Sequence, residues 1–258
     1  MLLDNKVVVV SGVGPGLGRS IAMACAGHGA DVVLAARTRS RLDAVASEVE
    51  AAGRKALAVP TDLADDEQCA ELARQALDRF GRVDVLVNNA FHQPPFETLA
   101  EQSLDAVRNS FETNPLTALR LTKLFTPSLV ETGGSVVMVN SVILRHTLPT
   151  FGAYKMAKHA LLAMAQTLSA ELGPQGVRVN SVAPGYIWGD SLKWYFATLA
   201  RDRGVSAEHV RDEVAATLDL RFIPDPDSIA QAAAFLASDM ARAITGQCLD
   251  VNAGEHHS

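Results

Sequence analysis

Short runs of apolar, often β-branched residues alternate along this chain with longer stretches in which apolar residues recur at helical spacing. Most of the short runs are continuously apolar, which is typical of strands covered on both faces. They predict strands at Lys6–Val10, Asp31–Ala35, Lys55–Val59, Val83–Val87, Ser135–Asn140, Arg178–Val182 and Gln247–Val251. The longer stretches predict helices at Gly18–His28, Ser40–Ala52, Asp66–Phe80, Leu104–Leu129, Tyr154–Leu172 and Asp227–Ala237.

This alternation favours parallel strands joined by right-handed crossover helices. The sequence therefore predicts an α/β fold: a single doubly wound parallel sheet of Rossmann type, with about seven strands and helices on both faces. No linker or repeat divides residues 1–258, so we expect one domain. The long stretch 185–226 is an exception to the alternation, and we expect it to carry short helices such as Ser206–Leu218 and to form a substrate lid at about 186–222.

Local signals predict where helices begin, end and bend. Asp227 followed by Ser228 indicates a helix start, and three glycines stand where helices should end, at Gly53, Gly81 and Gly173. Pro115 lies inside the stretch Leu104–Leu129 and has no N–H to donate, so the helix should kink there.

The composition excludes several classes of protein. The chain has 258 residues, 48% of them hydrophobic, and can bury a large core without disulfides or metals. Its net charge of −6 and lack of a dense basic block argue against nucleic acid and anionic membranes as partners. No apolar run approaches the roughly 18–20 residues of a membrane helix. The first residues, with an acidic Asp4, enter a strand pattern rather than a signal peptide.

The cysteines and histidines also bear on location and metal binding. Cys25, Cys69 and Cys248 lie far apart and outside any Cys-x-x-Cys pair, which indicates buried thiols in a reducing cytoplasm. The seven histidines show neither an HExxH motif nor paired ligand spacing, and the adjacent His256 and His257 resemble a tail. We therefore expect a cytoplasmic protein without a metal site.

Four glycines fall between the first predicted strand and the helix after it, where residues 11–18 read Ser-Gly-Val-Gly-Pro-Gly-Leu-Gly. Glycines permit a tight turn and let the backbone approach a pyrophosphate, which rests on the N–H groups at the helix N-terminus. An ordinary strand–helix turn is the alternative. The number of glycines and their place in the first βα turn favour nucleotide binding.

Tyr154 and Lys158 stand four positions apart at the start of an apolar helix, which places them on one helix face. A lysine ammonium favours a phenolate, so we expect Lys158 to lower the pKa of Tyr154 and make it an acid/base near neutral pH. Such pairs also occur by chance. Ser141 follows a predicted strand, and the carboxyl ends of parallel strands face the ligand crevice, where its hydroxyl could meet a substrate carbonyl.

Together with the glycine loop, these residues resemble the catalytic set of the classical short-chain dehydrogenases/reductases, in particular the 3-oxoacyl-carrier-protein reductase-like branch. Residues 11–18 resemble the family's TGxxxGxG loop, with Ser11 in place of Thr. Further segments carry the resemblance over essentially the whole chain: Pro60-Thr61-Asp62-Leu63, Asn88-Asn89-Ala90, Pro184-Gly185 and Thr245-Gly246-Gln247. The resemblance implies a catalytic tetrad of Asn114, Ser141, Tyr154 and Lys158.

The resemblance also implies which residues contact a nicotinamide cofactor. They are Ser11, Gly12, Gly16, Leu17, Gly18, Arg37, Asp62, Leu63, Asn89, Ala90, Tyr154, Lys158, Pro184, Gly185 and Ile187. It implies that Asp62 contacts the adenine, and that the helix bends at Asn114, whose main chain holds a water in a proton relay. The chain departs from the family at Phe91, where a Gly is expected, and at Trp188, where many members have Thr.

The end of the second strand bears on the choice of cofactor. Enzymes that prefer NAD usually carry an acid there that binds both ribose hydroxyls. Here the position is Ala36, followed by Arg37, so no carboxylate repels a 2′-phosphate and a guanidinium can pair with it. Arg39 and Arg41 add positive potential, or form only the solvated start of a helix. We expect NADP(H), with NAD(H) as the alternative.

These observations predict an oxidoreductase that transfers a hydride between NADP(H) and a ketone or secondary alcohol. Tyr154 is expected to be the general acid/base, and Ser141 to bond the developing alkoxide. One alternative is an NAD-linked alcohol dehydrogenase working oxidatively. Another is a nucleotide-binding regulator without turnover, which would typically lack the tyrosine or the lysine.

Aromatic residues gather at the start of the lid stretch, at Tyr186, Trp188, Trp194, Tyr195 and Phe196. We expect Trp188 and Trp194, with Phe91 and Leu144 opposite, to line a substrate pocket that favours a bulky apolar ketone over a small sugar. The aromatics could instead only dock the lid. A further alternative is that Arg145, His146 and Lys193 receive an anionic group.

The segment His159–Leu168 is apolar over more than one helix face, which exceeds what a helix needs to cover a sheet. We expect a homo-oligomer, and the family resemblance implies a homotetramer. Deeper burial of this helix under neighbouring loops is the alternative.

Overall fold

A single seven-stranded sheet forms the centre of the computed structural model, which describes residues 1–92 and 94–257. The strands lie in the order β3-β2-β1-β4-β5-β6-β7, and every neighbouring pair is parallel. They are β1 (Val7–Ser11), β2 (Asp31–Ala36), β3 (Ala56–Pro60), β4 (Val85–Asn88), β5 (Ser135–Val139), β6 (Arg178–Pro184) and β7 (Cys248–Val251). The predicted α/β fold is confirmed, and each strand lies within two residues of its predicted bounds.

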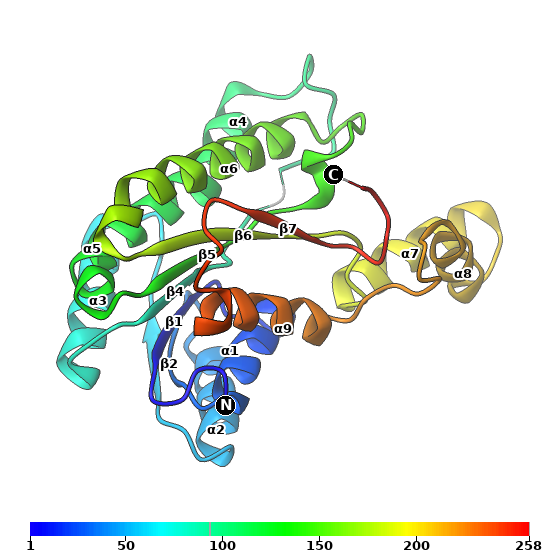
Figure 1. Cartoon of the computed structure of the whole chain (residues 1–258). Coiled ribbons are helices and arrows are strands. Elements are labelled where there is room, and N and C mark those ends of the chain that lie inside the picture. Colours follow the sequence, from blue (N-terminus) through cyan, green and yellow to red (C-terminus); the bar gives the residue numbers. More distant parts are fainter. Residues whose placement is uncertain (93, 258) are drawn as a thin grey trace.

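Helices cover both faces of the sheet (Figure 1). Those described are α1 (Leu17–Gly27), α2 (Arg39–Ala51), α3 (Asp66–Phe80), α4 (Leu104–Phe111), α5 (Thr117–Thr132), α6 (Gly152–Leu172), α7 (Asp190–Arg203), α8 (Ala207–Thr217) and α9 (Pro226–Ala237). In β1, Val8 and Val10 pack with α1, α2 and α9, whereas Val7 and Val9 pack with α3, α5 and α6. Because successive side chains point to opposite faces, strands between two helix layers must be apolar at every position.

The predicted helix Leu104–Leu129 is wrong as a single element. A π-helical segment, Glu112–Leu116, separates α4 from α5. The buried Pro115 lies inside this segment, and its missing N–H cannot complete a regular helical ladder. The predicted kink is therefore present, in the form of a local widening of the helix.

One predicted helix start needs correction, and two predicted helix ends are confirmed. The N-cap of α9 is Asp225, not Asp227, because the Asp225 carboxylate accepts from the backbone N–H of Ser228 at 2.8 Å. Helix α6 ends at Leu172 with Gly173 as its C-cap, as predicted, and the chain then forms a 3₁₀ turn that reverses at Gly176, which has a φ of +84°. Gly81, with a φ of +75°, ends α3 as predicted.

The stretch predicted to be irregular contains two helices. Beyond the expected α8, residues 190–203 form α7, which the sequence pattern did not predict. Leu192, Phe196, Leu199 and Ala200 share one face of α7 and pack together, whereas Trp194 and Tyr195, next to Phe196, are exposed. The two helices enclose a small core of their own around Phe196, Ala200 and Val210, and stand out to the side of the sheet (Figure 1). We call this unit the α7–α8 hairpin.

No helix in the described part of the chain is long and apolar enough to cross a membrane. The cysteines are free, and burial raises the pKa of Cys25 to about 12. Cys25 and Cys69 are buried as predicted. Cys248, on the edge strand β7, is only half-buried, so the prediction of buried thiols is wrong for that residue.

Candidate active site

The glycine loop between β1 and α1 is held tightly against the chain after β4. Gly12 has a φ of +73°, and a Cβ atom there would lie 2.5 Å from the Cα of Ala90. A Cβ on Gly18 would lie 2.4 Å from the carbonyl oxygen of Gly12. Gly16 has open space around its Cβ position and begins α1 without any side-chain cap. The helix thus begins with N–H groups that no side chain caps, the arrangement that binds a phosphate.

Ser11 supports this loop from inside. It is fully buried, and its hydroxyl accepts from the backbone N–H groups of Asn89 at 3.2 Å and Ala90 at 3.4 Å. The Asn89 amide in turn donates to the carbonyl oxygens of Ser11 and Gly12. Ser11 therefore acts on the position of the loop, which differs from the direct contact that the resemblance implied.

A groove of about 930 Å³ opens in front of the loop, along the carboxyl ends of the strands. Ten of the predicted cofactor residues line it: Gly12, Gly16, Leu17, Gly18, Arg37, Asp62, Leu63, Asn89, Ala90 and Ile187. The other five are not among its lining residues: Ser11, Tyr154, Lys158, Pro184 and Gly185. The groove is large enough for a dinucleotide-sized ligand.

One end of the groove carries unpaired positive charge. Ala36 ends β2, and Arg37 and Arg41 beyond it line the groove. Within residues 1–92 and 94–257, neither arginine has an ion pair. Arg39 differs, because it faces away into solvent and pairs with Asp43 at 2.8 Å. The expected positive potential thus comes from Arg37 and Arg41.

Ser141, Tyr154 and Lys158 come together where β5 ends and α6 begins. The Ser141 hydroxyl lies close enough to the Tyr154 phenol to lower its pKa, and its Oγ accepts from the backbone N–H of Ile143 at 3.3 Å. The Lys158 side chain is only 2% exposed, and its Nζ donates to the carbonyl oxygen of Val139 at 2.9 Å. That Nζ lies 5.6 Å from the centre of the Tyr154 ring.

The pKa values in this cluster run against the sequence-based expectation. Burial raises the pKa of Tyr154 to about 12, and the nearby Ser141 hydroxyl offsets part of that rise. Burial lowers the pKa of Lys158 to about 7. The expectation that Lys158 lowers the pKa of Tyr154 is therefore wrong for this structure, because both groups lose hydration and the ammonium bonds Val139 instead.

Asn114 lies in the π-helical segment and is buried. Its side-chain nitrogen donates to the carbonyl oxygen of Ser110 at 2.8 Å. Its side-chain oxygen is buried without a hydrogen-bond partner among the described residues. A buried unpaired amide oxygen costs free energy, so this atom is a place where a water would be held.

The four predicted pocket residues divide into two pairs. Phe91 and Trp188 line the groove, and the Phe91 ring lies 6.4 Å from that of Tyr154. Leu144 and Trp194 do not line it: Leu144 is buried, and Trp194 is 71% exposed on the outer side of α7. The aromatic cluster was predicted from sequence proximity alone, and helical geometry turns its members in different directions.

The three residues that we considered as partners of an anionic group lie in different surroundings. Arg145 is bound to Asp250 at 3.0 Å, so its charge is already neutralised. Lys193 lines the groove beside the Trp188 ring. His146 lies instead against the C-terminal segment.

Sequence reasoning missed several parts of the site. The groove is also lined by Thr38, His92, Asn109, Thr113, Pro226 and Asp227. The last two come from the first turn of α9, and no local signal marks them as groove residues. The C-terminal segment was also missed: the space beside Gly185 is filled by Glu255, whose carboxylate oxygen lies 2.2 Å from the Cβ position of that glycine.

Comparison with known proteins places these features in context. A family model described as Enoyl-(Acyl carrier protein) reductase matches residues 12–256. An uncharacterized oxidoreductase of Mycobacterium tuberculosis is 40% identical over 254 residues, which cover 98% of this chain and 92% of that protein.

Two solved structures share the whole fold. A 7α-hydroxysteroid dehydrogenase complexed with NADH and 7-oxo glycochenodeoxycholic acid is 28% identical, with a TM-score of 0.88 over 98% of this chain and 94% of that one. L-sorbose reductase from Gluconobacter frateurii, complexed with NADPH and L-sorbose, is 27% identical, with a TM-score of 0.93 over 100% of both chains.

Proposed function

This chain belongs to the short-chain dehydrogenase/reductase family of oxidoreductases, which act on alcohol or carbonyl groups, and we propose that it reduces an apolar ketone with NADPH. The observation that carries the proposal is the position of Ser141, Tyr154 and Lys158. They lie together at the carboxyl edge of the sheet, and Phe91 connects them to the groove.

The residues present fit a dinucleotide. Gly12 and Gly18 let the loop pack closely on the backbone around it, Gly16 has open space at its Cβ position, and the uncapped start of α1 offers N–H groups to a pyrophosphate. Asp62 and Leu63 line the groove where an adenine would lie, and Ile187 lines its other side. A nicotinamide cofactor, when bound, would supply or accept the hydride.

The chain itself handles the proton. With a pKa of about 12, Tyr154 keeps its proton at neutral pH and can give it to a developing alkoxide. Ser141 can hold the same oxygen by a hydrogen bond from its hydroxyl. Lys158, with a pKa of about 7, is suited to exchange a proton near neutral pH, and the free oxygen of Asn114 can hold a water on that route.

Preference for NADP(H) over NAD(H) is supported by the two unpaired arginines at the end of β2. Arg37→Asp is expected to raise the KM for NADPH and to shift the preference toward NADH, because a phosphate partner becomes a repelling acid. The measurement is kcat/KM with each cofactor, and Arg39→Asp is the matched control because Arg39 does not line the groove. If the ratio of kcat/KM for NADPH to kcat/KM for NADH is unchanged in Arg37→Asp, Arg37 does not contact the cofactor.

An apolar substrate is supported by Phe91, Trp188 and Leu192, which line the groove near Tyr154 or on the hairpin. The names of the two solved structures include both a steroid and a sugar, so the proposal rests on these side chains. We propose that the α7–α8 hairpin is the lid that closes over the substrate. The alternative is that Lys193 binds an anionic substrate, and it is supported by the position of Lys193 in the lining of the groove.

The test is oxidation of NADPH and NADH with a panel of ketones of increasing apolar size, beside small polar carbonyls and carboxylated ketones. We expect kcat/KM to rise with apolar size and to be higher with NADPH. Higher values for small polar carbonyls would reject the apolar pocket. If the protein binds the cofactor but reduces none of these carbonyl compounds, a nucleotide-binding regulator would be favoured.

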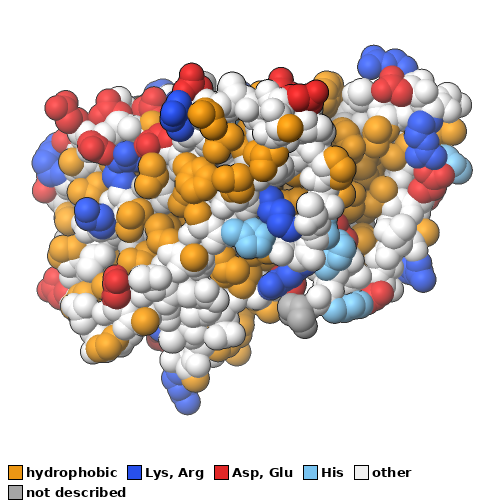
Figure 2. Space-filling model, turned by 90° about the horizontal axis from the view of Figure 1, so that it is seen from above, with side chains coloured by type: hydrophobic (Ala, Val, Ile, Leu, Met, Phe, Trp, Pro, Cys, Tyr) orange, Lys and Arg blue, Asp and Glu red, His pale blue; other side chains and the backbone are white. Residues whose placement is uncertain are grey.

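A homotetramer in the cytoplasm completes the proposal. In α6, Leu161, Ala165 and Leu168 are buried in the core, whereas Met156 is 42% exposed. Figure 2 shows the face over α4 and α6, where hydrophobic side chains gather between charged groups. Such a face suits contact with further copies. Light scattering at micromolar concentration is expected to give four chains, and a monomer would contradict it.

A further inference from the structure

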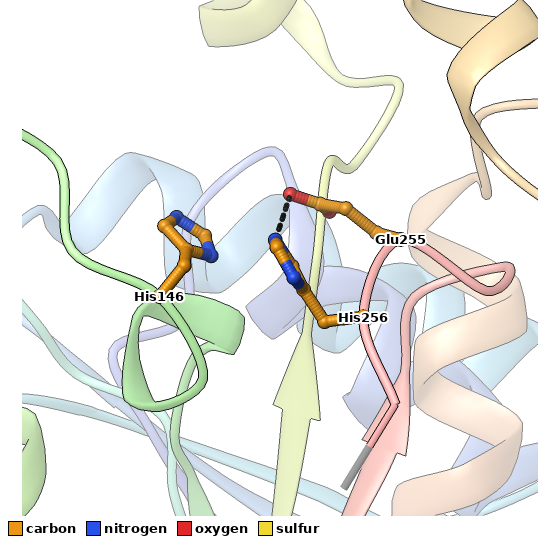
Figure 3. Close-up of side chains that lie close together, drawn as sticks. All are labelled: His146, Glu255 and His256. Atoms are coloured by element: carbon orange, nitrogen blue, oxygen red, sulfur yellow. Dashed lines mark ion pairs between the residues drawn. The ribbon is translucent and has the colours of Figure 1, made fainter.

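Three potential metal ligands meet outside the groove, between the loop after Ser141 and the C-terminal segment (Figure 3). They are His146, Glu255 and His256, and their ligand atoms all lie within 4.8 Å of one another. Figure 3 shows the three side chains pointing into the same space from two separate segments. None of the three lines the groove.

The three side chains form no hydrogen bonds with one another. The two imidazole rings are stacked with centres 4.4 Å apart, so neither donates a hydrogen bond to the other. The His146 Nδ1 atom is buried and has no hydrogen-bond partner among the described residues. His256 Nε2 lies 3.9 Å from a Glu255 carboxylate oxygen, beyond hydrogen-bond distance. Buried polar atoms without partners are uncommon and call for an explanation.

The segments that carry the cluster are fixed from behind. The second carboxylate oxygen of Glu255 accepts from the backbone N–H of Tyr186 at 3.2 Å. The Asn252 side chain donates to the carbonyl oxygen of His256 at 2.9 Å. Arg145, which precedes His146, is bound to Asp250 at the end of the sheet. Such outer contacts orient ligands around a metal.

We propose that His146, Glu255 and His256 form a binding site for a divalent transition-metal ion, with Zn²⁺ as the expected occupant. Two imidazole nitrogens and one carboxylate oxygen suit zinc and disfavour Mg²⁺ or Ca²⁺, which prefer all-oxygen sites. Ligand atoms of a tetrahedral zinc site lie about 3.4 Å apart, so zinc binding would bring these atoms closer together than their present separations of up to 4.8 Å.

The ion would join the C-terminal segment to the loop after Ser141. Glu255 is also the group that fills the space beside Gly185, so the site lies at the same edge of the sheet as the proposed reaction centre. We assign the ion a tethering role for this segment, and none in hydride or proton transfer.

The test is Zn²⁺ binding to the full-length chain with any purification tag removed, by calorimetry and by metal analysis after dialysis. We expect one ion per chain and a higher Tm with Zn²⁺. His146→Ala, Glu255→Gln and His256→Ala should each weaken binding by more than the roughly 10–100-fold that loss of an outer contact costs. Co²⁺ should give the visible absorption of a tetrahedral site in the wild type and lose it in all three variants.

His257→Ala is the matched control, because His257 is the adjacent histidine, is 80% exposed and pairs with Asp219 outside the cluster. It should bind Zn²⁺ as the wild type does. Binding that persists in His146→Ala but is lost in His257→Ala would show that only the two adjacent tail histidines hold the ion, and would overturn the proposal. Absence of binding at 100-fold excess of Zn²⁺ over protein would overturn it as well.

Discussion

The start of α6 lies beside Phe91 of the groove, the first turn of α7 lines the groove, and the two regions differ in how their side chains are held. Lys158 and Asn114, on the sheet side, are buried and bonded to backbone carbonyls. In the hairpin, Phe196 is buried only among residues of the hairpin and its connections, and Trp194 is exposed. The side chains that would transfer protons are therefore held in position by the main core of the protein. The side chains that would contact the substrate are held only by the small core of the hairpin. A small core can open without unfolding the sheet.

The largest effect that can test this difference is loss of the phenolic proton. Tyr154→Phe should lower kcat by about 10²–10⁴-fold, the usual contribution of a general acid, while cofactor affinity stays close to that of the wild type. The measurements are steady-state kinetics and NADPH binding by fluorescence. The hairpin variant Tyr195→Phe is the control and should keep nearly full activity. Tyr154→Phe activity above about 1% of wild type would contradict the role.

The sheet side is also the part that the sequence predicted well. Continuously apolar runs such as Val7–Val10 are stable as strands when helices cover both faces of the sheet, so the positions of the strands follow from local patterns. The spacing of Tyr154 and Lys158 on one helix face, after Ser141 at a strand end, placed three side chains together from simple helix and sheet geometry.

Features that depend on contacts between distant segments were not predictable in this way. Phe196 is buried together with Ala200 of its own helix and Val210 of α8. The apolar spacing in α7 is that of a helix, but it does not reveal that α8 packs on this face. His146 and Glu255 meet through the C-terminal segment, although they are far apart in the sequence. The pKa of Tyr154 depends on burial by its surroundings, which outweighs the charge expected from the motif.

A second test compares two buried phenylalanines. Phe125 belongs to the core between the sheet and α5, so Phe125→Ala should lower the free energy of unfolding by about 3–5 kcal/mol. Phe196→Ala should change global unfolding much less, because the hairpin core can be lost by itself. Its effect should appear as faster amide exchange in α7 and α8 and a higher KM for the ketone. Equal losses in urea unfolding would mean that hairpin and sheet form one cooperative unit.

The buried lysine gives a smaller, pH-dependent effect on stability. Its pKa is about 7 in the folded protein and about 10.5 in the unfolded chain, so between these values the unfolded state binds more protons. The free energy of unfolding should therefore rise with pH, by about 2 kcal/mol from pH 7 to pH 9. Lys158→Met should remove this part of the rise, whereas the hairpin variant Lys193→Met should keep it. Urea unfolding at both pH values measures it, and identical slopes for all three proteins would refute the buried-lysine account.

The smallest expected effect separates the two tryptophans of the hairpin region. Trp188 lines the groove and packs on Phe196, with its backbone N–H bonded to the carbonyl oxygen of Pro224 at 2.8 Å. Trp188→Ala should lower kcat/KM for a bulky apolar ketone on the order of tenfold relative to a small polar carbonyl, the usual range for lost apolar contact in a pocket. Trp194 points outward, so Trp194→Ala should change that ratio less than about twofold. A larger change from Trp194 would mean that the hairpin turns this exposed side chain inward when it closes over the substrate.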